Sequence, residues 1–483
     1  MVVVLNKDVN NYPFWSNGEW KTSTSNRWID IPSPATGRIV GRVPAMTKEE
    51  VDSAIQAAVI AQKEWAKLPV HERGRILLTW ADELVSRADE IAEVIMREVG
   101  KKKAAARDEV VRTADLIRYN VEEGKRLHGE LMKGDSFYGG SSKKVAMIDK
   151  EPLGVILAIS PFNYPVNLSA AKIAPALITG NTVVLKPATQ GSISALLMIE
   201  ALEKAGLPKG VLNVVTGKGS EIGDYLVTHP SIQLISFTGG TKTGRDIAQK
   251  AAMIPLVLEL GGKDPAIVLE DADLELTASQ IVSGAFSYSG QRCTAIKRVL
   301  VMDTIADDLI GRLKAKVEKL SVGLPEENAD ITPLIDQGSA DFVHGLIVEA
   351  LGQGAEVITG NQRNGNLIYP TVLDYVTSDM RVAWEEPFGP VLPIIRIQSE
   401  AEAIDLANQS EYGLQASIFT QNIDKAFQLA SQLDVGSVQL NGRTERGPDH
   451  FPFLGVKNSG MGVQGVRRSI ESMTRDKIVI LNL

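Results

Sequence analysis

Cysteine is almost absent from this sequence: Cys293 is the single one among 483 residues. One thiol cannot form an intramolecular disulfide or a cysteine-rich metal site, so neither kind of structural support is expected within the chain. Two roles remain for Cys293, a small buried side chain or a nucleophile, and for an isolated cysteine the buried role is the commoner. A single cysteine is also typical of a protein in a reducing cytoplasm.

Long hydrophobic runs are missing as well. No apolar stretch reaches the about 18 residues that a membrane-spanning helix requires. The apolar run at residues 1–5 follows no basic region and precedes no small-residue cleavage pattern, so it is not typical of a secretory signal. We therefore expect a cytoplasmic protein that has no membrane partner.

An excess of positive charge is the third absence. The chain carries 51 basic and 59 acidic side chains, a formal net charge of −8, and the charges are dispersed rather than gathered in blocks. This balance argues against nucleic acid as a partner. The sequence contains no internal repeat or low-complexity tract, and its length predicts two or more globular domains.

Hydrophobic periodicity indicates how the first half of the chain is organised. Residues 48–127 have the spacing of long amphipathic helices, and we expect one helical layer there. After residue 154, short β-branched runs alternate with helical stretches. The predicted strands are 155–159, 182–185, 212–215, 234–237 and 256–260, and the predicted helices are 193–205 and 241–252. This alternation predicts a parallel, doubly wound sheet.

The same alternation resumes in the second half of the chain, with a predicted strand at 298–302 and a helix at 307–320. It predicts a second doubly wound α/β domain. The apolar run at 478–481 resembles an edge strand, and residues 143–148 have a similar pattern. Such a strand either joins a sheet of its own chain or pairs with another subunit, and we favour pairing between subunits.

The neighbours of Cys293 favour a reactive thiol over a buried one. Residues 283–290 end a helical stretch in serine and glycine, so Cys293 is expected on an accessible loop. Arg292 lies beside it, and a neighbouring guanidinium favours the thiolate, which is the reactive form. The sequence therefore predicts a nucleophilic cysteine.

Two polar side chains that follow predicted strands are candidates for the same site. Asn163 lies in a loop stiffened by two prolines, where its amide would donate to a developing oxyanion; an ordinary turn residue is the alternative. Glu259 ends an apolar strand, where a carboxylate needs a partner or a function. We predict a general base at Glu259, and an ion pair with Lys263 is the alternative.

Three segments indicate a bound nucleotide. One joins a strand to a helix around Gly239, Gly240 and Gly244, where free backbone N–H groups would meet a pyrophosphate at the helix N-terminus. It lacks the GxGxxG pattern and by itself is a weak signal. Lys186 ends another strand and would reach a ribose or a phosphate, with a solvated lysine as the alternative. Glu386 would bind a ribose diol, unless it is simply part of an acidic turn.

Four motifs in this order resemble those of the aldehyde dehydrogenase superfamily. They are Pro161-Phe162-Asn163, Leu258-Glu259-Leu260-Gly261-Gly262-Lys263, Gly290-Gln291-Arg292-Cys293 and Glu386-Pro387-Phe388-Gly389-Pro390. The resemblance covers nearly the whole chain and implies an aldehyde dehydrogenase-like α/β fold: two doubly wound domains plus a small β oligomerisation extension. The implied limits are 1–127 and 149–258 for the coenzyme-binding domain, 259–469 for the catalytic domain, and 128–148 and 470–483 for the oligomerisation segment of a homotetramer.

Within the superfamily, the chain is similar to the non-phosphorylating, NADP-dependent glyceraldehyde-3-phosphate dehydrogenases. The likeness extends past the general motifs around residues 160–167, 288–295 and 446–453. It implies that the substrate-binding residues are Arg112, Tyr164, Arg292, Thr294 and Arg446. The arginines suit a phosphate because a dianion needs several charge-assisted donors, and a guanidinium supplies them in pairs.

The resemblance also implies NADP as the coenzyme, with no metal ion. The residues expected to contact it are Ser160, Pro161, Phe162, Lys186, Thr189, Gly239, Gly240, Gly244, Glu386 and Phe388. Many NAD-preferring relatives carry a glutamate at the position of Thr189, where it would repel a 2′-phosphate; Thr189 is neutral and can donate. Gly240 departs from the family pattern, because many relatives have a serine there and its hydroxyl contact is lost.

The implied reaction is the irreversible oxidation of glyceraldehyde 3-phosphate to 3-phosphoglycerate. Cys293 attacks the aldehyde carbon, the Asn163 amide and the Cys293 N–H hold the oxyanion, and Glu259 activates the water that hydrolyses the thioester. Three alternatives stay open. They are another small aldehyde such as a semialdehyde or lactaldehyde, a CoA-acylating relative, against which Glu259 argues, and a non-catalytic scaffold.

Overall fold

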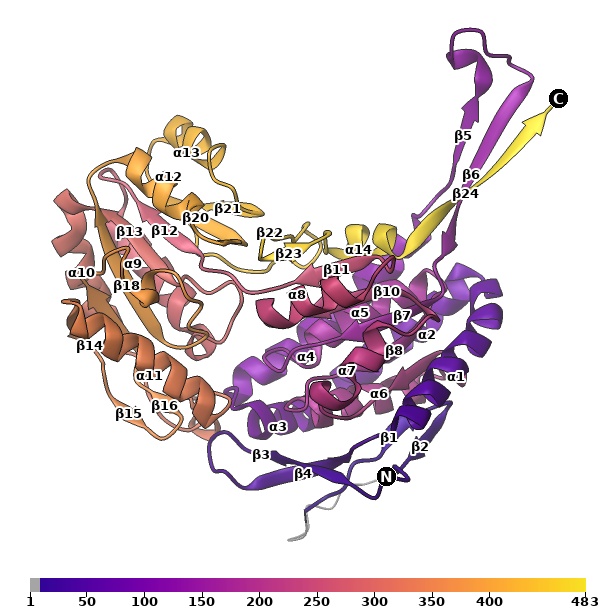
Figure 1. Ribbon diagram of the computed structural model, residues 1–483, viewed down its shortest axis with the longest axis horizontal. Helices are drawn as coiled ribbons and strands as arrows, with labels where there is room; N and C mark the ends of the chain where they lie inside the picture. The colour runs from indigo at the N-terminus through magenta and orange to yellow at the C-terminus, as the bar shows by residue number, and fades with distance from the viewer. Residues whose placement is uncertain (1–8) are drawn as a thin grey trace.

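The computed structural model describes residues 9–483, which form two α/β domains side by side and a narrow β arm that projects from the first domain (Figure 1). The apolar run at residues 1–5, on which the expectation about secretion rests, lies outside the described residues. Within residues 9–483, no helix is both long enough and apolar enough to cross a membrane.

The first domain is built on a six-stranded sheet in the order β23-β11-β10-β7-β8-β9. Its five parallel strands are the predicted ones: β7 (Val155–Ile159), β8 (Thr182–Lys186), β9 (Leu212–Val214), β10 (Ile232–Thr238) and β11 (Leu256–Glu259). The chain runs outward from β7 to β9 and then returns to β10 on the other side of β7. The direction therefore switches between β7 and β10, where the carboxyl ends of the strands open a crevice for a ligand.

Helices cover both faces of this sheet. One face carries α1 (Lys48–Lys67), α7 (Gly219–Val227) and α8 (Thr241–Lys250). The other carries α5 (Asn167–Ile178) and α6 (Ser192–Lys204), on which α2 (Val70–Ser86), α3 (Ala88–Val99) and α4 (Lys103–Lys125) pack. The single helical layer predicted for residues 48–127 is wrong, because the chain changes face after α1. Leu68 is extended there, as expected before Pro69, and this ends the helix.

The second domain is built on a seven-stranded sheet in the order β14-β17-β18-β13-β12-β20-β21. Its strands are β12 (Pro265–Val268), β13 (Arg298–Met302), β14 (Glu356–Thr359), β17 (Thr371–Asp374), β18 (Val391–Ile397), β20 (Gln415–Phe419) and β21 (Ser437–Leu440). One face carries α9 (Leu274–Phe286) and α10 (Asp303–Val317), and the other carries α11 (Gln337–Gly352), α12 (Glu400–Asn408) and α13 (Ile423–Ala430). The second α/β domain is confirmed, although α10 begins four residues before the predicted helix.

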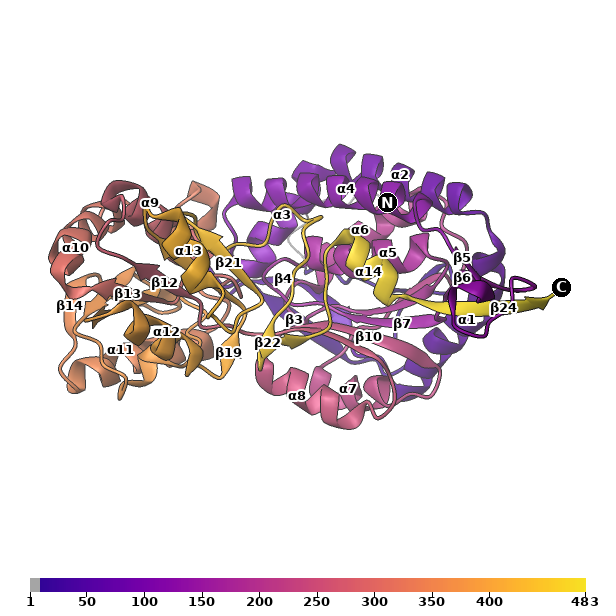
Figure 2. The ribbon, with the colours of Figure 1, turned by 90° about the horizontal axis from the view of Figure 1, so that it is seen from above.

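The last part of the chain returns from the second domain to the first, and Figure 2 shows it crossing between them. β23 (Gly460–Met461) pairs with β11, and α14 (Val466–Ser472) packs on α4 and α5. The limits expected at 258 and 469 therefore differ from sheet membership. Glu259 belongs to the first sheet, and so does β23.

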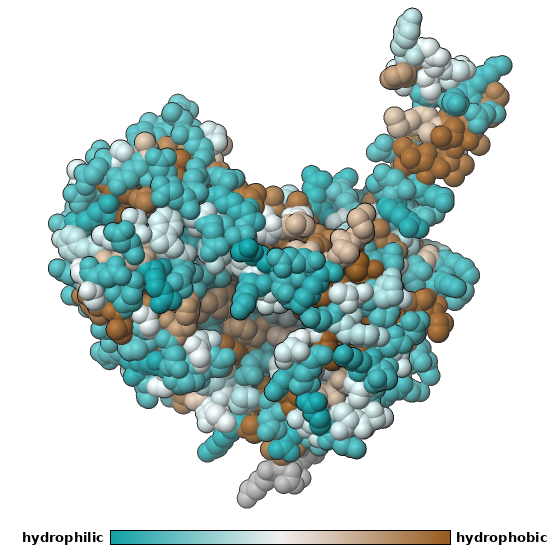
Figure 3. All heavy atoms as spheres, viewed as in Figure 1, coloured by the Kyte–Doolittle hydropathy of each residue, from teal (hydrophilic) through white to brown (hydrophobic). Residues whose placement is uncertain are grey.

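The projecting arm is a separate antiparallel sheet of β5 (Glu130–Lys133), β6 (Lys144–Pro152) and β24 (Thr474–Asn482). The two predicted edge strands pair with each other within the chain, from Thr474 with Pro152 to Asn482 with Lys144. Apolar side chains of the arm are exposed and form a brown patch in Figure 3: Leu131, Met132, Met147, Ile478, Val479 and Ile480.

The remaining elements are short strands around the two sheets. They are β1 (Phe14–Ser16), β2 (Glu19–Lys21), β3 (Trp28–Pro32), β4 (Ile39–Pro44), β15 (Arg363–Asn364), β16 (Leu367–Ile368), β19 (Tyr412–Gly413) and β22 (Val456–Lys457).

Candidate active site

The predicted motifs meet between the two domains. The ring of Phe162, from the loop after β7, contacts the ring of Phe388 edge-on, with 5.9 Å between ring centres. The side-chain amide of Asn163 donates to the carbonyl of Gln291 at 3.0 Å. The coenzyme-side loop, the turn before Cys293 and the proline-rich turn at residues 386–390 therefore form one site, although they are far apart in the sequence.

A fixed, irregular turn presents Cys293. After α9, Tyr288 and Ser289 take left-handed backbone conformations, with φ of 52° and 53°. The Ser289 hydroxyl donates to the Thr332 carbonyl and accepts from its N–H, both at 2.8 Å. Gly290, with φ of 72°, lies against the backbone of Gly389, so a side chain at this position would collide with the proline-rich turn. Strain held in place by the surroundings is common at functional sites.

The thiol of Cys293 is only partly accessible. Burial raises its pKa to about 11, Lys297 acts in the opposite direction, and Glu259 adds to the increase. Burial lowers the pKa of Arg292 while the charge of Cys293 raises it, so Arg292 favours the thiolate as expected, and Lys297 is a second cation that does so. The Arg292 guanidinium points back to the Gly284 carbonyl at 2.5 Å, whereas Lys297 donates to the backbone carbonyl of Cys293.

Both predicted oxyanion donors, the Asn163 amide and the Cys293 backbone N–H, have an N–H group available. Asn163 is buried, and one of its amide N–H groups is already used by Gln291, which orients the side chain. Among the described residues, no acceptor is found for the backbone N–H of Cys293. The Cys293 N–H and the second amide hydrogen of Asn163 can therefore donate to an oxygen that develops charge beside the thiol.

Glu259 has a different partner from the one considered as its alternative. Arg446 donates to both of its oxygens, at 3.0 and 2.8 Å, and the Thr238 hydroxyl donates to one of them at 2.9 Å. The ion pair with Lys263 is wrong, because the Lys263 ammonium is buried without a hydrogen-bond partner in the described structure. Burial lowers the pKa of Lys263 well below its ordinary value.

Two lysines of the site were missed from the sequence. Lys172 is fully buried and donates to Thr238 at 2.6 Å, and burial lowers its pKa to about 8. Lys297 is 1% exposed and bonds Glu386 at 2.8 Å as well as the Cys293 carbonyl. A signal for Lys172 was available, since it is the one charged residue in a mostly apolar helix, α5, where an unpaired charge is costly.

On the predicted coenzyme side, the ammonium group of Lys186 has few acceptors. Lys186 is only 7% exposed, and the one acceptor found for it in the described structure is the Pro187 carbonyl at 3.3 Å. Burial accordingly lowers the pKa of Lys186 to about 8. A ribose hydroxyl or a phosphate would supply the missing acceptors, so the site fits a nucleotide.

The glycine-rich segment joins β10 to α8 as predicted. The Gly239 N–H is not free, because it donates to the Glu259 carbonyl at 3.1 Å. The first N–H groups of α8 lack intrahelical acceptors, as in any helix, and remain available to a phosphate. A side chain at Gly240 would meet open space, whereas one at Gly239 would collide with Phe237 and one at Gly244 with Leu260, so packing favours glycine at these two positions.

The other predicted coenzyme contacts line the same crevice. The Ser160 hydroxyl is buried and accepts from Ser169 at 2.7 Å, while Pro161 and Thr189 are partly exposed. Glu386 accepts from Lys297 and from the Gly262 N–H at 3.2 Å, so its ribose role requires it to keep or exchange these partners. These contacts to a coenzyme remain predictions.

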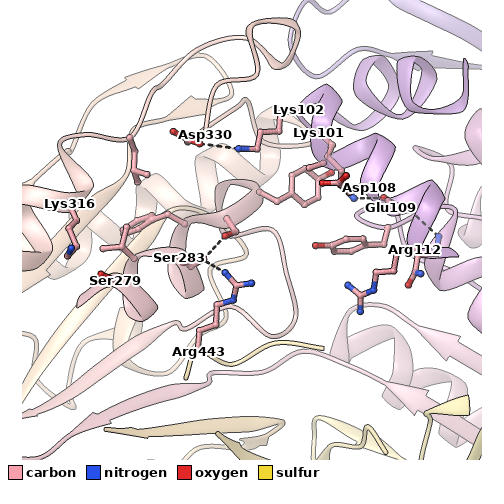
Figure 4. A pocket seen from close by; sticks show the side chains of 18 residues that line it. Lys101, Lys102, Asp108, Glu109, Arg112, Ser279, Ser283, Lys316, Asp330 and Arg443 are labelled. Atoms are coloured by element: carbon pink, nitrogen blue, oxygen red, sulfur yellow. Dashed lines mark hydrogen bonds and ion pairs between the residues drawn. The ribbon is translucent and has the colours of Figure 1, made fainter. Parts of the chain in front are cut away.

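A cavity of about 660 Å³ lies beside the turn that precedes Cys293. Arg112 on α4 and Arg443 after β21 enter it from different domains (Figure 4). Tyr164 also lines it, and its ring stacks against the Lys101 ammonium at 3.6 Å. Of the predicted substrate-binding residues, Arg112 and Tyr164 thus face the cavity, and Arg292, Thr294 and Arg446 are not part of its described lining.

The predicted phosphate-binding arginines already have partners. Arg112 binds Asp449 through two hydrogen bonds, at 2.6 and 2.7 Å, and donates to the Arg446 carbonyl at 2.6 Å. Arg446 binds Glu259. Thr294 is buried, and its carbonyl accepts from Thr444 at 2.9 Å. Within residues 9–483, no group of three or more potential metal ligands is found.

These features define a class: a two-domain α/β protein whose one cysteine lies between a buried lysine at the end of β8 and a cavity that two arginines enter. The chain belongs to the aldehyde dehydrogenase family, whose model matches residues 20–479.

Individual relatives are similar over nearly the whole chain. The NADP-dependent glyceraldehyde-3-phosphate dehydrogenase of Streptococcus equinus is 56% identical over 98% of this chain and 99% of its own length. The 3-sulfolactaldehyde dehydrogenase of Priestia aryabhattai is 39% identical, with the same coverage of 98% and 99%. The crystal structure of the NADP-dependent glyceraldehyde-3-phosphate dehydrogenase of Bacillus halodurans C-125, complexed with NADP, is 62% identical with a TM-score of 0.97, over 98% of this chain and 99% of that one.

Proposed function

We propose that this chain oxidises glyceraldehyde 3-phosphate to 3-phosphoglycerate, reduces NADP and uses water to release the product. The observation that carries the proposal is the cationic cavity beside the turn that precedes Cys293: Arg112, Tyr164 and Arg443 line it, and the Arg112 guanidinium donates to the backbone carbonyl of Arg446 at 2.6 Å. The similarity to the two glyceraldehyde-3-phosphate dehydrogenases supports it over nearly the full chain.

The residues divide the chemistry between them. Cys293 adds to the aldehyde carbon, and the Cys293 N–H and the Asn163 amide stabilise the oxyanion that forms. Lys297 holds the Cys293 carbonyl and favours the thiolate. After oxidation the acyl group remains on Cys293 as a thioester, and Glu259 takes a proton from the water that attacks it.

NADP, when bound, supplies the acceptor for the two electrons and the hydrogen that leave the substrate carbon. Lys186 and Thr189 would hold its ribose and 2′-phosphate, and the N-terminus of α8 its pyrophosphate. The ring of Phe388 and the carboxylate of Glu386 would face the nicotinamide end. The preference for NADP over NAD thus depends on Lys186, which is a cation, and on Thr189, which is a neutral donor at a position where a carboxylate would repel the 2′-phosphate.

The β arm supports a further part of the proposal, that the chain forms a homotetramer. Its exposed apolar side chains and the outer edge of β24 offer a surface that a second copy can cover. We also propose a cytoplasmic location, together with the sequence-based domain division, modified so that β11 and β23 belong to the coenzyme-binding domain.

Steady-state kinetics with three aldehydes test the substrate. We expect kcat/KM for glyceraldehyde 3-phosphate to exceed that for glyceraldehyde by about thirty- to a thousandfold, because charge-assisted donors contribute about 2 to 4 kcal/mol to a bound dianion. Lactaldehyde serves as the third substrate. Equal values for phosphorylated and unphosphorylated aldehydes would instead support an enzyme of another small aldehyde.

A further inference from the structure

Arg446 is bound to the predicted base and, within residues 9–483, to no other carboxylate. Its Nη1 donates to both oxygens of Glu259, and its Nη2 donates to Gln464 at 3.0 Å. Phe453 lies beneath the guanidinium, 5.0 Å from ring centre to Cζ. Three neighbours therefore hold Arg446 in place, and one of them is the carboxylate that thioester hydrolysis needs.

Arg446 also covers Glu259. The side chain of Glu259 is 4% exposed and that of Arg446 is 15% exposed, so the guanidinium is the more accessible member of the pair. One oxygen of Glu259 accepts from Thr238 in addition. With both oxygens engaged and little solvent access, Glu259 is poorly placed to bind a water molecule and take its proton.

The pair acts on the thiol itself. Burial is the main reason that the pKa of Cys293 rises to about 11, and Glu259 and Arg446 change it in opposite directions. Both charges therefore lie close enough to the thiol for their partners to matter during the reaction.

The substrate's phosphate requires the same guanidinium, if the proposed function holds. A phosphate carries about −1.5 to −2 charge and has three acceptor oxygens, which makes it a stronger partner for arginine than a single carboxylate. Arg112, which donates to the Arg446 carbonyl, would bind the same anion by exchanging its hydrogen bonds to Asp449. Binding of the phosphate and pairing with Glu259 thus compete for Arg446.

We propose that Arg446 is a latch: it holds Glu259 while the phosphate site is empty, and it releases Glu259 when the phosphate of a substrate draws the guanidinium away. The protein then selects a phosphorylated substrate twice, once when the aldehyde binds and again when the thioester is hydrolysed. An acyl group without a phosphate reaches Cys293 but leaves Glu259 latched.

The released step is an ordinary hydrolysis. The water oxygen forms a bond to the acyl carbon, one of its protons passes to the freed oxygen of Glu259, and the bond between the acyl carbon and the Cys293 sulfur breaks. The products are the carboxylic acid and the thiolate, and no electrons change hands.

The latch is tested by measuring the acyl-enzyme directly. Protein with NADP is mixed with glyceraldehyde 3-phosphate or with glyceraldehyde, quenched in acid and weighed intact by mass spectrometry, while NADPH is followed by absorbance. We expect the glyceroyl adduct from glyceraldehyde to accumulate and to decay at least about tenfold more slowly than its phosphorylated counterpart, a factor within the usual range of coupling between sites. Equal decay rates would overturn the latch.

The variant Arg446→Met separates the latch from a structural ion pair. The free Glu259 should hydrolyse the unphosphorylated adduct about tenfold faster than in the unaltered protein, a gain that a damaged site would not produce. Arg467→Met is the matched control, since Arg467 lies in the same C-terminal part of the chain but is exposed and binds Glu471 instead of Glu259. It should leave the decay unchanged. Unchanged or slower decay in Arg446→Met contradicts the proposal.

Inorganic phosphate provides a measurement without a mutation. Added to the unaltered protein, it should speed decay of the unphosphorylated adduct, and it should have no effect in Arg446→Met. No acceleration in the unaltered protein overturns the latch. The two proposals fail differently: a protein that does not prefer glyceraldehyde 3-phosphate loses the proposed function, whereas one that prefers it but hydrolyses both adducts alike loses only the latch.

Discussion

The coenzyme crevice and the arginine cluster, by which we mean Arg112, Arg443 and Arg446, prepare for their anions in opposite ways. In the crevice, Lys186 is buried with one weak acceptor, and its pKa falls to about 8 as a result. In the cluster, each guanidinium already binds a carboxylate, from Asp449, Glu445 or Glu259.

This difference affects how each region selects the anion that it binds. The crevice carries its desolvation cost before the ligand arrives, so binding the nucleotide restores lost hydrogen bonds. In the cluster, an arginine must exchange its carboxylate partner for the phosphate, and the effect on the protein depends on which carboxylate is displaced. Displacing Asp449 affects binding only, whereas displacing Glu259 affects the reaction.

Removing the thiol between the two regions should have the largest effect. Cys293→Ala should reduce turnover to below about a thousandth, because no covalent intermediate can form, while NADP binding stays within about twofold. Absorbance at the NADPH band and calorimetric titration with NADP measure the two quantities. Turnover within tenfold of the unaltered protein would show that another group is the nucleophile.

Glu259→Gln should remove the base through which the arginine cluster affects the reaction. The amide keeps the hydrogen bond from Thr238 but cannot take a proton from water, so NADPH should appear in a burst followed by turnover at least about a hundredfold slower. Stopped-flow absorbance resolves the two phases. Loss of the burst itself would mean that Glu259 acts before the thioester forms.

Thr189→Glu should reduce the preference of the coenzyme crevice for NADP over NAD. A carboxylate next to a 2′-phosphate repels it, and because Thr189 is partly exposed we expect a change of about ten- to a hundredfold in the ratio of NADP to NAD affinity. Thr189→Gln, which adds a similar bulk without charge, is the control. An unchanged preference would place the 2′-phosphate elsewhere.

The smallest effect should be the pH dependence of coenzyme binding. With a pKa of about 8, Lys186 is mostly charged at about pH 7 and mostly neutral at about pH 9, and only the charged form attracts a phosphate. The 2′-phosphate itself is already a dianion in this range, with a second pKa of about 6. NADP affinity should therefore fall by up to about tenfold as pH rises, and Lys186→Met should flatten the titration curve. A flat curve in the unaltered protein would exclude a charge-dependent contact.

Local patterns in the sequence were sufficient for much of the fold. The strands β7 to β11 coincide with β-branched runs, and the turn from β10 to α8 coincides with the glycine-rich segment, because periodicity and turn chemistry act over a few residues. The single helical layer failed for a different reason. Amphipathic spacing shows that α1 has an apolar face but not which face of the sheet it covers.

The candidate site was likewise predictable from the sequence only in part. The nucleophile, the base and the amide follow from motifs, and these residues do meet. Their partners do not follow: Arg446 reaches Glu259 across 187 positions of the chain, and Arg112 reaches Asp449 across 337. Lys297 joins Arg292 in favouring the thiolate, and this second cation could not be inferred from the sequence around Cys293.

The sequence by itself therefore determined the α/β architecture and the family and predicted the reacting groups, because these depend on residue type and short-range spacing. Only the tertiary structure decided which charges share a partner and which groups are left without one. Those outcomes depend on desolvation and on distances of a few ångströms between segments that are far apart in the chain, and both arise only when the two domains pack around Cys293.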